Sequence, residues 1–146
     1  MTVSEDINTL IPQRDPIQMV DRLESVDGKK GFTSLSIKAG NFFIDDDGLI
    51  AEAGLIEHIA QSASALAGYM ALQNGATEPP VGFIGEVSHF TCHYRPAAGT
   101  TLHTVVEMGP EAEGVTLLKG ATTDDDGKAV ADTRMKIFIE NDNKNK

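Results

Sequence analysis

The feature that most constrains the fold is a long helical segment of small residues, predicted from about Leu49 to about Gln73. Asn74-Gly75 and then two prolines follow it, which predicts that the helix stops there. Alanine, serine and glycine recur along the segment: Ala60, Ala63, Ser64, Ala67, Gly68 and Ala71. Small side chains let other parts of the chain approach closely, so we expect this helix to be wrapped by the rest of the molecule.

Segments with alternating apolar residues lie on both sides of this helix in the sequence. Before it, residues 17–26 and 31–37 form a predicted hairpin around Asp27-Gly28. After it, four further strands are predicted, at 81–94, 100–108, 115–124 and 128–140. A turn is expected at 109–114, and the polar tail 141–146 is expected to be disordered. Strands interrupted by a single helix predict the α+β class, with an antiparallel sheet laid against that helix.

Composition limits the domain organisation and the classes of partner. A length of 146 residues and a hydrophobic content of 40% fit one domain, which we place at residues 1–140. The formal net charge of −10 argues against broad binding to nucleic acid or to an anionic membrane. The sequence shows no membrane span and no secretory signal, and its one cysteine, Cys92, cannot form an internal disulfide. These features predict a cytoplasmic protein.

Two polar residues of the predicted helix stand out as site candidates. Glu57 and Gln61 are four residues apart, so they project from the same helix face. A carboxylate on a tightly wrapped, largely apolar helix favours a role in proton transfer, whereas the alternative is an ordinary surface glutamate. We expect Glu57 to be catalytic and Gln61 to orient its carboxyl group or to hold a water.

Three segments carry a family resemblance. Leu10–Leu23 reads LIPQRDPIQMVDRL, Asn41–Phe43 reads NFF, and Glu57–Gln61 reads EHIAQ. They are similar to the LLPHRxPxLLVDRV, PFF and ExxAQ segments of the hotdog-fold 3-hydroxyacyl-[acyl-carrier-protein] dehydratases. The resemblance implies a hotdog fold, in which a curved antiparallel sheet wraps one long helix. It also implies a homodimer or higher homo-oligomer, joined edge to edge or through the helix face.

The resemblance further implies an activity and roles for particular residues. The reaction is dehydration of a 3-hydroxyacyl thioester, on acyl carrier protein or coenzyme A, to a 2-enoyl thioester in fatty-acid or polyketide-like lipid biosynthesis. No metal or organic cofactor is implied. Glu57 would handle the proton of the leaving hydroxyl, and the amide of Gly54, near the first helical turn, would bind the developing enolate. Phe43, Phe83 and Tyr69 would line the acyl pocket.

The loop before the helix departs from the common family pattern. The best-known dehydratases carry Gly-His-Phe-Pro there, whose histidine abstracts the α-proton, whereas this chain reads IDDDGLI at residues 44–50. The loop is more similar to that of a divergent branch linked to aryl-polyene pathways. Asp46 is a candidate replacement base, although a plain acidic turn is the alternative because 124–127 repeats the letters DDDG. A histidine from elsewhere is the other candidate: His89, His93 or His103.

Two other functions remain open on the same scaffold. One is an acyl thioesterase, in which a carboxylate activates water against the thioester carbonyl. The other is a non-catalytic module that binds an acyl group or a carrier protein. Because carrier proteins and this chain are both acidic, a carrier complex would need a local basic patch. The basic residues available for it include Arg14, Arg95, Lys119, Lys128, Arg134 and Lys136.

Overall fold

The structure is a computed structural model that describes residues 1–78 and 80–140. The predicted disorder of the tail 141–146 therefore lies outside the described residues. In chain order the elements are η1 (Ile7–Thr9), β1 (Arg22–Asp27), β2 (Lys30–Ser36), α1 (Glu52–Gln73), β3 (Val81–Cys92), β4 (Thr101–Ala112), β5 (Val115–Thr123) and β6 (Ala129–Glu140).

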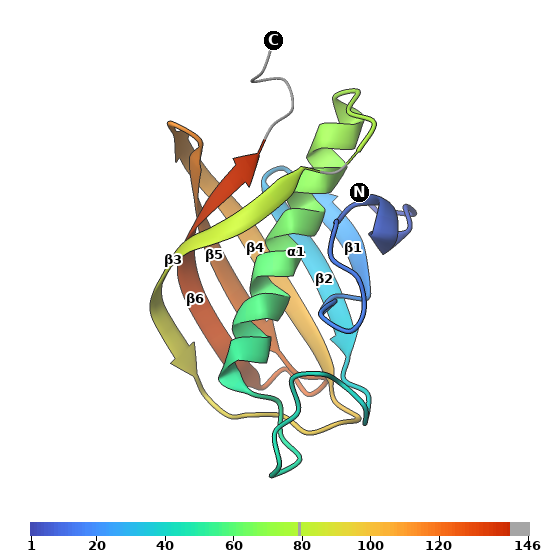
Figure 1. Ribbon diagram of the computed structural model, residues 1–146, viewed down its shortest axis with the longest axis vertical. Coiled ribbons are helices and arrows are strands. Elements are labelled where there is room, and N and C mark those ends of the chain that lie inside the picture. Colours follow the sequence, from blue (N-terminus) through green and yellow to red (C-terminus); the bar gives the residue numbers. More distant parts are fainter. Residues whose placement is uncertain (79, 141–146) are drawn as a thin grey trace.

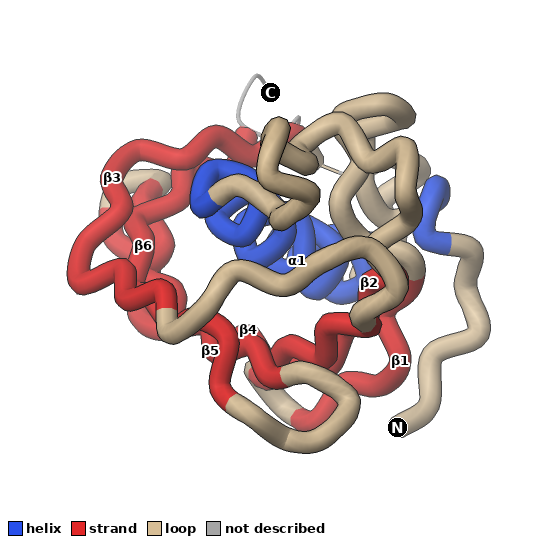
Figure 2. Tube along the Cα trace, turned by 90° about the horizontal axis from the view of Figure 1, so that it is seen from below, coloured by secondary structure: helices blue, strands red, loops and turns tan. Residues whose placement is uncertain are grey.

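The strands form one antiparallel sheet in the order β1-β2-β4-β5-β6-β3. Helix α1 runs diagonally across one face of this sheet (Figure 1). Seen along the orthogonal direction, the sheet curls around the helix (Figure 2). The α+β class and the antiparallel sheet wrapped around one long helix are therefore confirmed. None of the helices in the described part of the chain is long and apolar enough to cross a membrane.

The small residues of α1 are explained by close approaches of other backbone and side chains. A Cβ atom added at Gly68 would lie 1.9 Å from the carbonyl oxygen of Leu10, in the N-terminal segment that crosses the helix. One added at Gly120 of β5 would lie 2.4 Å from Cγ2 of Ile59 on α1. Both glycines allow contacts that a larger residue would prevent, so the helix packs against its surroundings at backbone distance.

The start of the helix differs from the prediction. Helix α1 begins at Glu52 rather than near Leu49, because the preceding residues form short bridges instead of a helical turn. Ile44 pairs with Ile50, and Leu49 pairs with Ala97. The loop and the first helical turn are thereby tied to the segment that connects β3 to β4.

Two strand boundaries also differ. Strand β1 begins at Arg22 rather than at residue 17, because the backbone at residues 17–19 bonds to a helix side chain instead of a neighbouring strand. The predicted turn at 109–114 is shorter, since β4 continues through a bulge to Ala112. The turn itself is Glu113-Gly114, whose φ angles of 54° and 82° suit a tight hairpin.

Candidate active site

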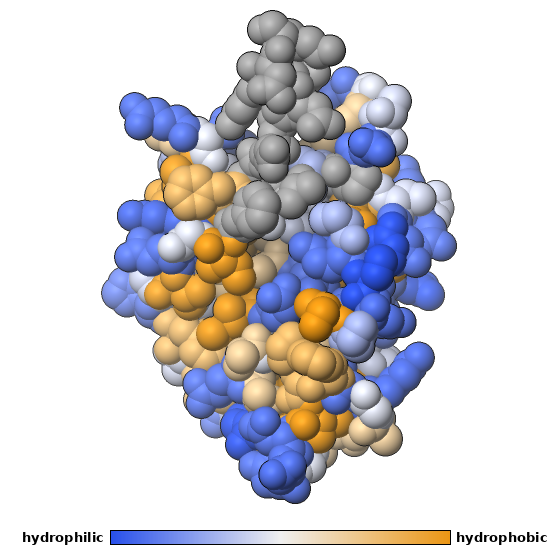
Figure 3. Space-filling view, viewed as in Figure 1, coloured by the Kyte–Doolittle hydropathy of each residue, from blue (hydrophilic) through white to orange (hydrophobic). Residues whose placement is uncertain are grey.

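The face of α1 that the sheet leaves open holds a pocket of about 200 Å³. Figure 3, drawn from the same side as Figure 1, shows apolar residues gathered on this face around the helix. The residues that line the pocket come from the N-terminal segment, α1, β3 and β6: Gln13, Glu57, Ala60, Ser64, Gly82, Ile84 and Ile137. The three helix residues are spaced i, i+3 and i+7, so one helix face forms the pocket floor.

Gln61 holds the carboxyl group of Glu57 in place. Its Oε1 accepts a hydrogen bond from the backbone N–H of Met19 at 2.6 Å, and its Nε2 donates to the carbonyl of Ile17 at 2.9 Å. The same Nε2 donates to Oε2 of Glu57 at 2.8 Å. Gln61 is fully buried, so these bonds fix both its own amide and the half-buried carboxyl one turn earlier. Gln61 is thus bonded to the Glu57 carboxyl group, and its role in catalysis, orienting that group or holding a water, stays a prediction.

Gly54 has a packing role in the structure. Its N–H donates to the carbonyl of Ala51 at 2.9 Å, within the first turn of the helix. A Cβ atom added at Gly54 would lie 2.6 Å from Cβ of Phe43 and 3.2 Å from Cγ1 of Ile50. The glycine therefore lets the Phe43 loop lie directly on the helix start. For Gly54 to bind an enolate, its N–H would have to exchange the Ala51 carbonyl for the substrate oxygen.

The acidic loop is held by one arginine that sequence reasoning assigned to a basic patch. Arg95 donates to Asp47 Oδ2 and to Asp45 Oδ2, each at 2.8 Å. It also donates to the carbonyls of Ile50 at 2.8 Å and Leu49 at 3.2 Å. Hydrogen bonds from the Leu49 N–H and from Arg95 lower the pKa of Asp47, which suits a permanently ionised anchor rather than a base. Two of the three loop aspartates therefore hold the loop in shape.

Asp46 lies apart from the other candidates. It occupies the exposed tip of the turn that the Gly48 N–H closes onto the Asp45 carbonyl at 2.9 Å. The residues that line the Glu57 pocket do not include it. Within one chain, the structure therefore does not bring Asp46 and Glu57 into the same pocket.

Two of the three predicted acyl-pocket residues, Phe43 and Tyr69, also lie outside this pocket. Phe43 is half-buried and packs on the hydrophobic cluster at the start of α1, and its ring meets Phe42 edge-on. Tyr69 is buried among N-terminal residues, where its hydroxyl donates to Sδ of Met1 at 3.1 Å. The side chain of Phe83 lies outside the described part of the structure. The apolar lining of the Glu57 pocket comes instead from Ala60, Ile84 and Ile137.

Two of the three histidines considered as the base, His93 and His103, pair with aspartates. His93 Nε2 lies 2.8 Å from Asp132 Oδ2, and His103 Nε2 lies 2.7 Å from Asp125 Oδ1, both in exposed pairs. His89 is exposed on the outer side of the sheet. No group of three or more histidine, cysteine, aspartate or glutamate side chains suited to a metal ion occurs among residues 1–78 and 80–140.

Sequence reasoning gave no role to His58, which is completely buried. Its Nδ1 lies 2.6 Å from the Met19 carbonyl and must donate, since a carbonyl only accepts. Its Nε2 then accepts a hydrogen bond from the Thr104 hydroxyl at 2.7 Å. The Thr104 hydroxyl in turn accepts one from the Thr122 hydroxyl at 2.6 Å. Burial lowers the pKa of His58 to about 4, so it is neutral near pH 7. His58 therefore joins α1, the N-terminal segment and the sheet.

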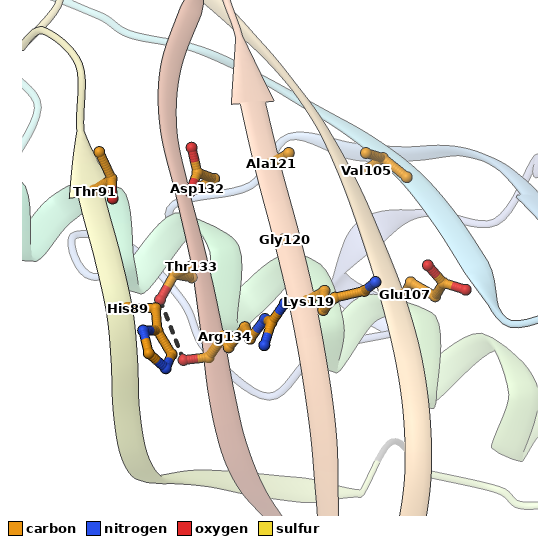
Figure 4. A pocket seen from close by; sticks show the side chains of 10 residues that line it. All are labelled: His89, Thr91, Val105, Glu107, Lys119, Gly120, Ala121, Asp132, Thr133 and Arg134. Atoms are coloured by element: carbon orange, nitrogen blue, oxygen red, sulfur yellow. Dashed lines mark hydrogen bonds between the residues drawn. The ribbon is translucent and has the colours of Figure 1, made fainter.

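A larger hollow of about 560 Å³ lies on the opposite, outer face of the sheet (Figure 4). Lys119 and Arg134 come from β5 and β6 there, with α1 behind the strands. Lys119 faces Glu107 across the β4–β5 pair, so basic and acidic side chains offset one another on this surface. Its size does not make it the better candidate, because it lacks a half-buried acid hydrogen-bonded to a buried amide, as Glu57 is to Gln61.

Comparison with solved structures defines the class of fold. The structure of "the dehydratase heterocomplex ApeI:P" from Xenorhabdus doucetiae matches with a TM-score of 0.87 at 14% identity, covering 97% of this chain and 95% of that chain. The PaaI protein of the phenylacetic acid degradation operon of Escherichia coli matches with a TM-score of 0.64 at 12% identity, covering 80% of each chain. A hypothetical thioesterase with coenzyme A from Streptococcus pneumoniae has a TM-score of 0.63 at 12% identity, covering 81% and 84%. The fold is the hotdog fold, as predicted.

The family follows from the sequence model. The chain belongs to the ApeP-like family, whose model, described as ApeP dehydratase, matches residues 5–146. The predicted membership of a divergent, aryl-polyene-type dehydratase branch is confirmed, and the protein is a dehydratase. No curated protein matches the chain.

Proposed function

We propose that the protein dehydrates a 3-hydroxyacyl thioester in the Glu57 pocket. The observation that carries this assignment is the carboxyl group of Glu57, fixed by Gln61 at 2.8 Å and lining a small pocket of mixed polar and apolar residues. A carboxyl group held in this way can exchange a proton with a leaving hydroxyl at a defined position. The amides at the start of α1, including Gly54, remain the proposed donors to the enolate oxygen.

The base that removes the α-proton is proposed to come from a second chain. The polar residues lining the pocket in one chain are Gln13, Glu57 and Ser64. Asp46 is exposed on a turn, and an exposed loop can reach across an interface more readily than a buried group. A second chain placed over the open face would bring Asp46 or a histidine opposite Glu57. The solved relative from Xenorhabdus is itself described as a heterocomplex, which supports assembly of this kind.

The test compares Glu57→Gln with wild type on 3-hydroxyacyl and saturated acyl thioesters. Loss of a positioned acid should lower the dehydration rate by about 10²-fold to 10⁴-fold, measured as enoyl absorbance. Glu52→Gln is the matched control, because Glu52 lies on the same helix but is exposed. Unchanged turnover by Glu57→Gln would refute the assignment. Free thiol released from the saturated substrate would instead indicate the alternative, a thioesterase, and absence of any turnover would indicate a binding module.

The proposal also names the molecule that carries the acyl group to the enzyme. We propose that the substrate arrives on an acyl carrier protein in the cytosol, although Arg14 and Arg95 are engaged with carbonyl and carboxylate groups of their own chain. The remaining basic candidates include Lys119, Arg134 and Lys136 on the outer sheet face. Turnover of carrier-bound substrate should then decline with salt, whereas turnover of the coenzyme A thioester should change less. Equal salt dependence would remove the carrier from the proposal.

A further inference from the structure

One atom in the Glu57 pocket region lacks a hydrogen-bond partner. Among the described residues, Oε1 of Gln13 is the only buried side-chain nitrogen or oxygen atom without one. Gln13 lines the same pocket of about 200 Å³ as Glu57. Buried polar atoms in folded proteins are nearly always paired, so an exception beside a candidate catalytic acid requires an explanation.

The backbone on either side of Gln13 is held by hydrogen bonds. Arg14 donates to the carbonyls of Ile11 at 2.7 Å, Gln13 at 2.9 Å and Asn8 at 2.8 Å, which holds the backbone of this segment. A few residues further on, Gln61 binds the backbone at Ile17 and Met19. The segment is therefore fixed on both sides of the pocket, and the unpaired amide oxygen is not explained by a loosely held loop.

We propose that Gln13 recognises the 3-hydroxyl group of the substrate. Oε1 is an acceptor and needs a donor, and the terminal amide turns about a torsion with a broad rotational preference, so it can face the pocket. A 3-hydroxyl group carries one hydrogen to donate to Gln13 and has lone pairs to accept from Glu57. Gln13 would thus select hydroxylated substrates over saturated ones, because the saturated chain leaves the amide oxygen unpaired.

This inference rests on the proposed function and assigns Gln13 no bond-making step. In the elimination, the α-carbon gives up its proton to the base, and the electron pair of that C–H bond forms the double bond. The C–O bond to the 3-hydroxyl breaks, and its electron pair remains on oxygen, which takes the proton of Glu57 and leaves as water. Gln13 holds the hydroxyl oxygen beside Glu57 before this step and makes no covalent bond.

The experiment measures binding of short 3-hydroxyacyl and saturated acyl thioesters of N-acetylcysteamine, matched in chain length. Gln13→Met keeps the length of the side chain and removes the amide. It should lower the preference for the hydroxylated thioester by about tenfold, in line with loss of one buried hydrogen bond, and leave binding of the saturated thioester unchanged or tighter. Gln18→Met is the matched control, because Gln18 is a half-buried loop glutamine whose Nε2 donates to the Val20 carbonyl at 3.1 Å outside this pocket.

The melting temperature provides a second readout, because substrate recognition and a purely structural role of Gln13 predict opposite changes in it. Removing an unpaired buried acceptor should leave the melting temperature of Gln13→Met equal to or above that of wild type, whereas loss of a structural hydrogen bond would lower it. An unchanged hydroxyl preference, or a lowered melting temperature, overturns the inference. Binding is measured in the Glu57→Gln background, where turnover of the hydroxylated thioester is slow under the proposed function, and dehydration is assayed separately with Glu57 present. A Gln13-dependent preference in a protein that does not dehydrate would refute the proposed function and leave the inference standing.

Discussion

At the scale of single residues, the buried polar network around His58 has a consequence for stability. The ring is neutral and hydrogen-bonded on both nitrogens. Protonation would turn Nε2 into a donor, although the Thr104 hydroxyl facing it already donates to that atom. The pKa of His58 in the folded protein, about 4, lies below the ordinary value of 6.5 that the unfolded chain has. Between these two values the unfolded chain binds more protons than the folded one.

The free energy of unfolding should therefore rise with pH between about 4 and 6.5 and be fully regained above that window. The shift corresponds to a loss on the order of 3 kcal/mol at the acid end. Urea unfolding at pH 5 and pH 7.5 measures it. In His58→Asn, the amide can donate in place of Nδ1 but does not titrate. The free energy of unfolding of this variant should therefore differ less between pH 5 and pH 7.5. The variant His103→Gln, at an exposed histidine, should keep the full difference, and equal pH dependence in all three proteins would contradict the mechanism.

The sequence identified Glu57 and Gln61 because a helix fixes which residues share a face. It gave no signal for Gln13, Arg95 or the partners of His58. Contacts of Arg95 and His58 join positions more than 40 residues apart, as between Arg95 and Ile50 and between His58 and Thr104. Periodicity reports which face of a helix is covered but not which segment covers it. Arg95 was consequently taken for a free surface charge, although it holds the acidic loop.

At the scale of elements, the packing of the N-terminal segment on α1 depends on Gly68. A methyl group there would meet the backbone carbonyl of Leu10 at 1.9 Å, and a backbone atom cannot move aside as a side chain can. Gly68→Ala should therefore destabilise the protein by about 3 kcal/mol or more, measured by urea unfolding. Alanine has a higher helix propensity than glycine, so helix propensity alone would predict a gain in stability instead.

Gly82→Ala is the comparison for this prediction. The added Cβ atom at Gly82 would come no closer than 3.4 Å to Oγ of Ser64, which is ordinary contact. We expect the free energy of unfolding to be unchanged or slightly higher in that variant. If Gly68→Ala were as stable as Gly82→Ala, the close contact between Leu10 and the helix would not exist in solution.

Most of the elements could be predicted, because hairpin turns and the alternation of apolar residues are local properties. The predicted element boundaries were wrong where long-range contacts replaced local structure. Residues 17–19 alternate like a strand, yet their backbone bonds to Gln61. Residues 109–110 contain glycine and proline, yet a bulge carries β4 past them to Glu111, which pairs with Thr116.

At the scale of the whole molecule, the open face of α1 predicts an assembly. Ile84, on the terminal strand β3, is 39% exposed beside the Glu57 pocket. If this face meets a second chain, Ile84→Glu should lower the molecular mass measured by light scattering. Phe32→Glu is a matched control, since Phe32 is also 39% exposed but lies on β2, which pairs with β1 and β4. Equal mass in both variants, or a greater loss with Phe32→Glu, would place the interface elsewhere.

The position of β3 at the end of the strand order affects how substrate range is determined. One wall of the Glu57 pocket is built from Gly82 and Ile84 of this strand, whose outer edge is not paired within the sheet. If a second chain pairs with this edge, the wall takes its final shape from that chain. The same gene product combined with two different partners would then offer two different cavities. The lengths of acyl chain accepted would become a property of the assembled complex, adjustable by exchanging a subunit without any change near the acid itself.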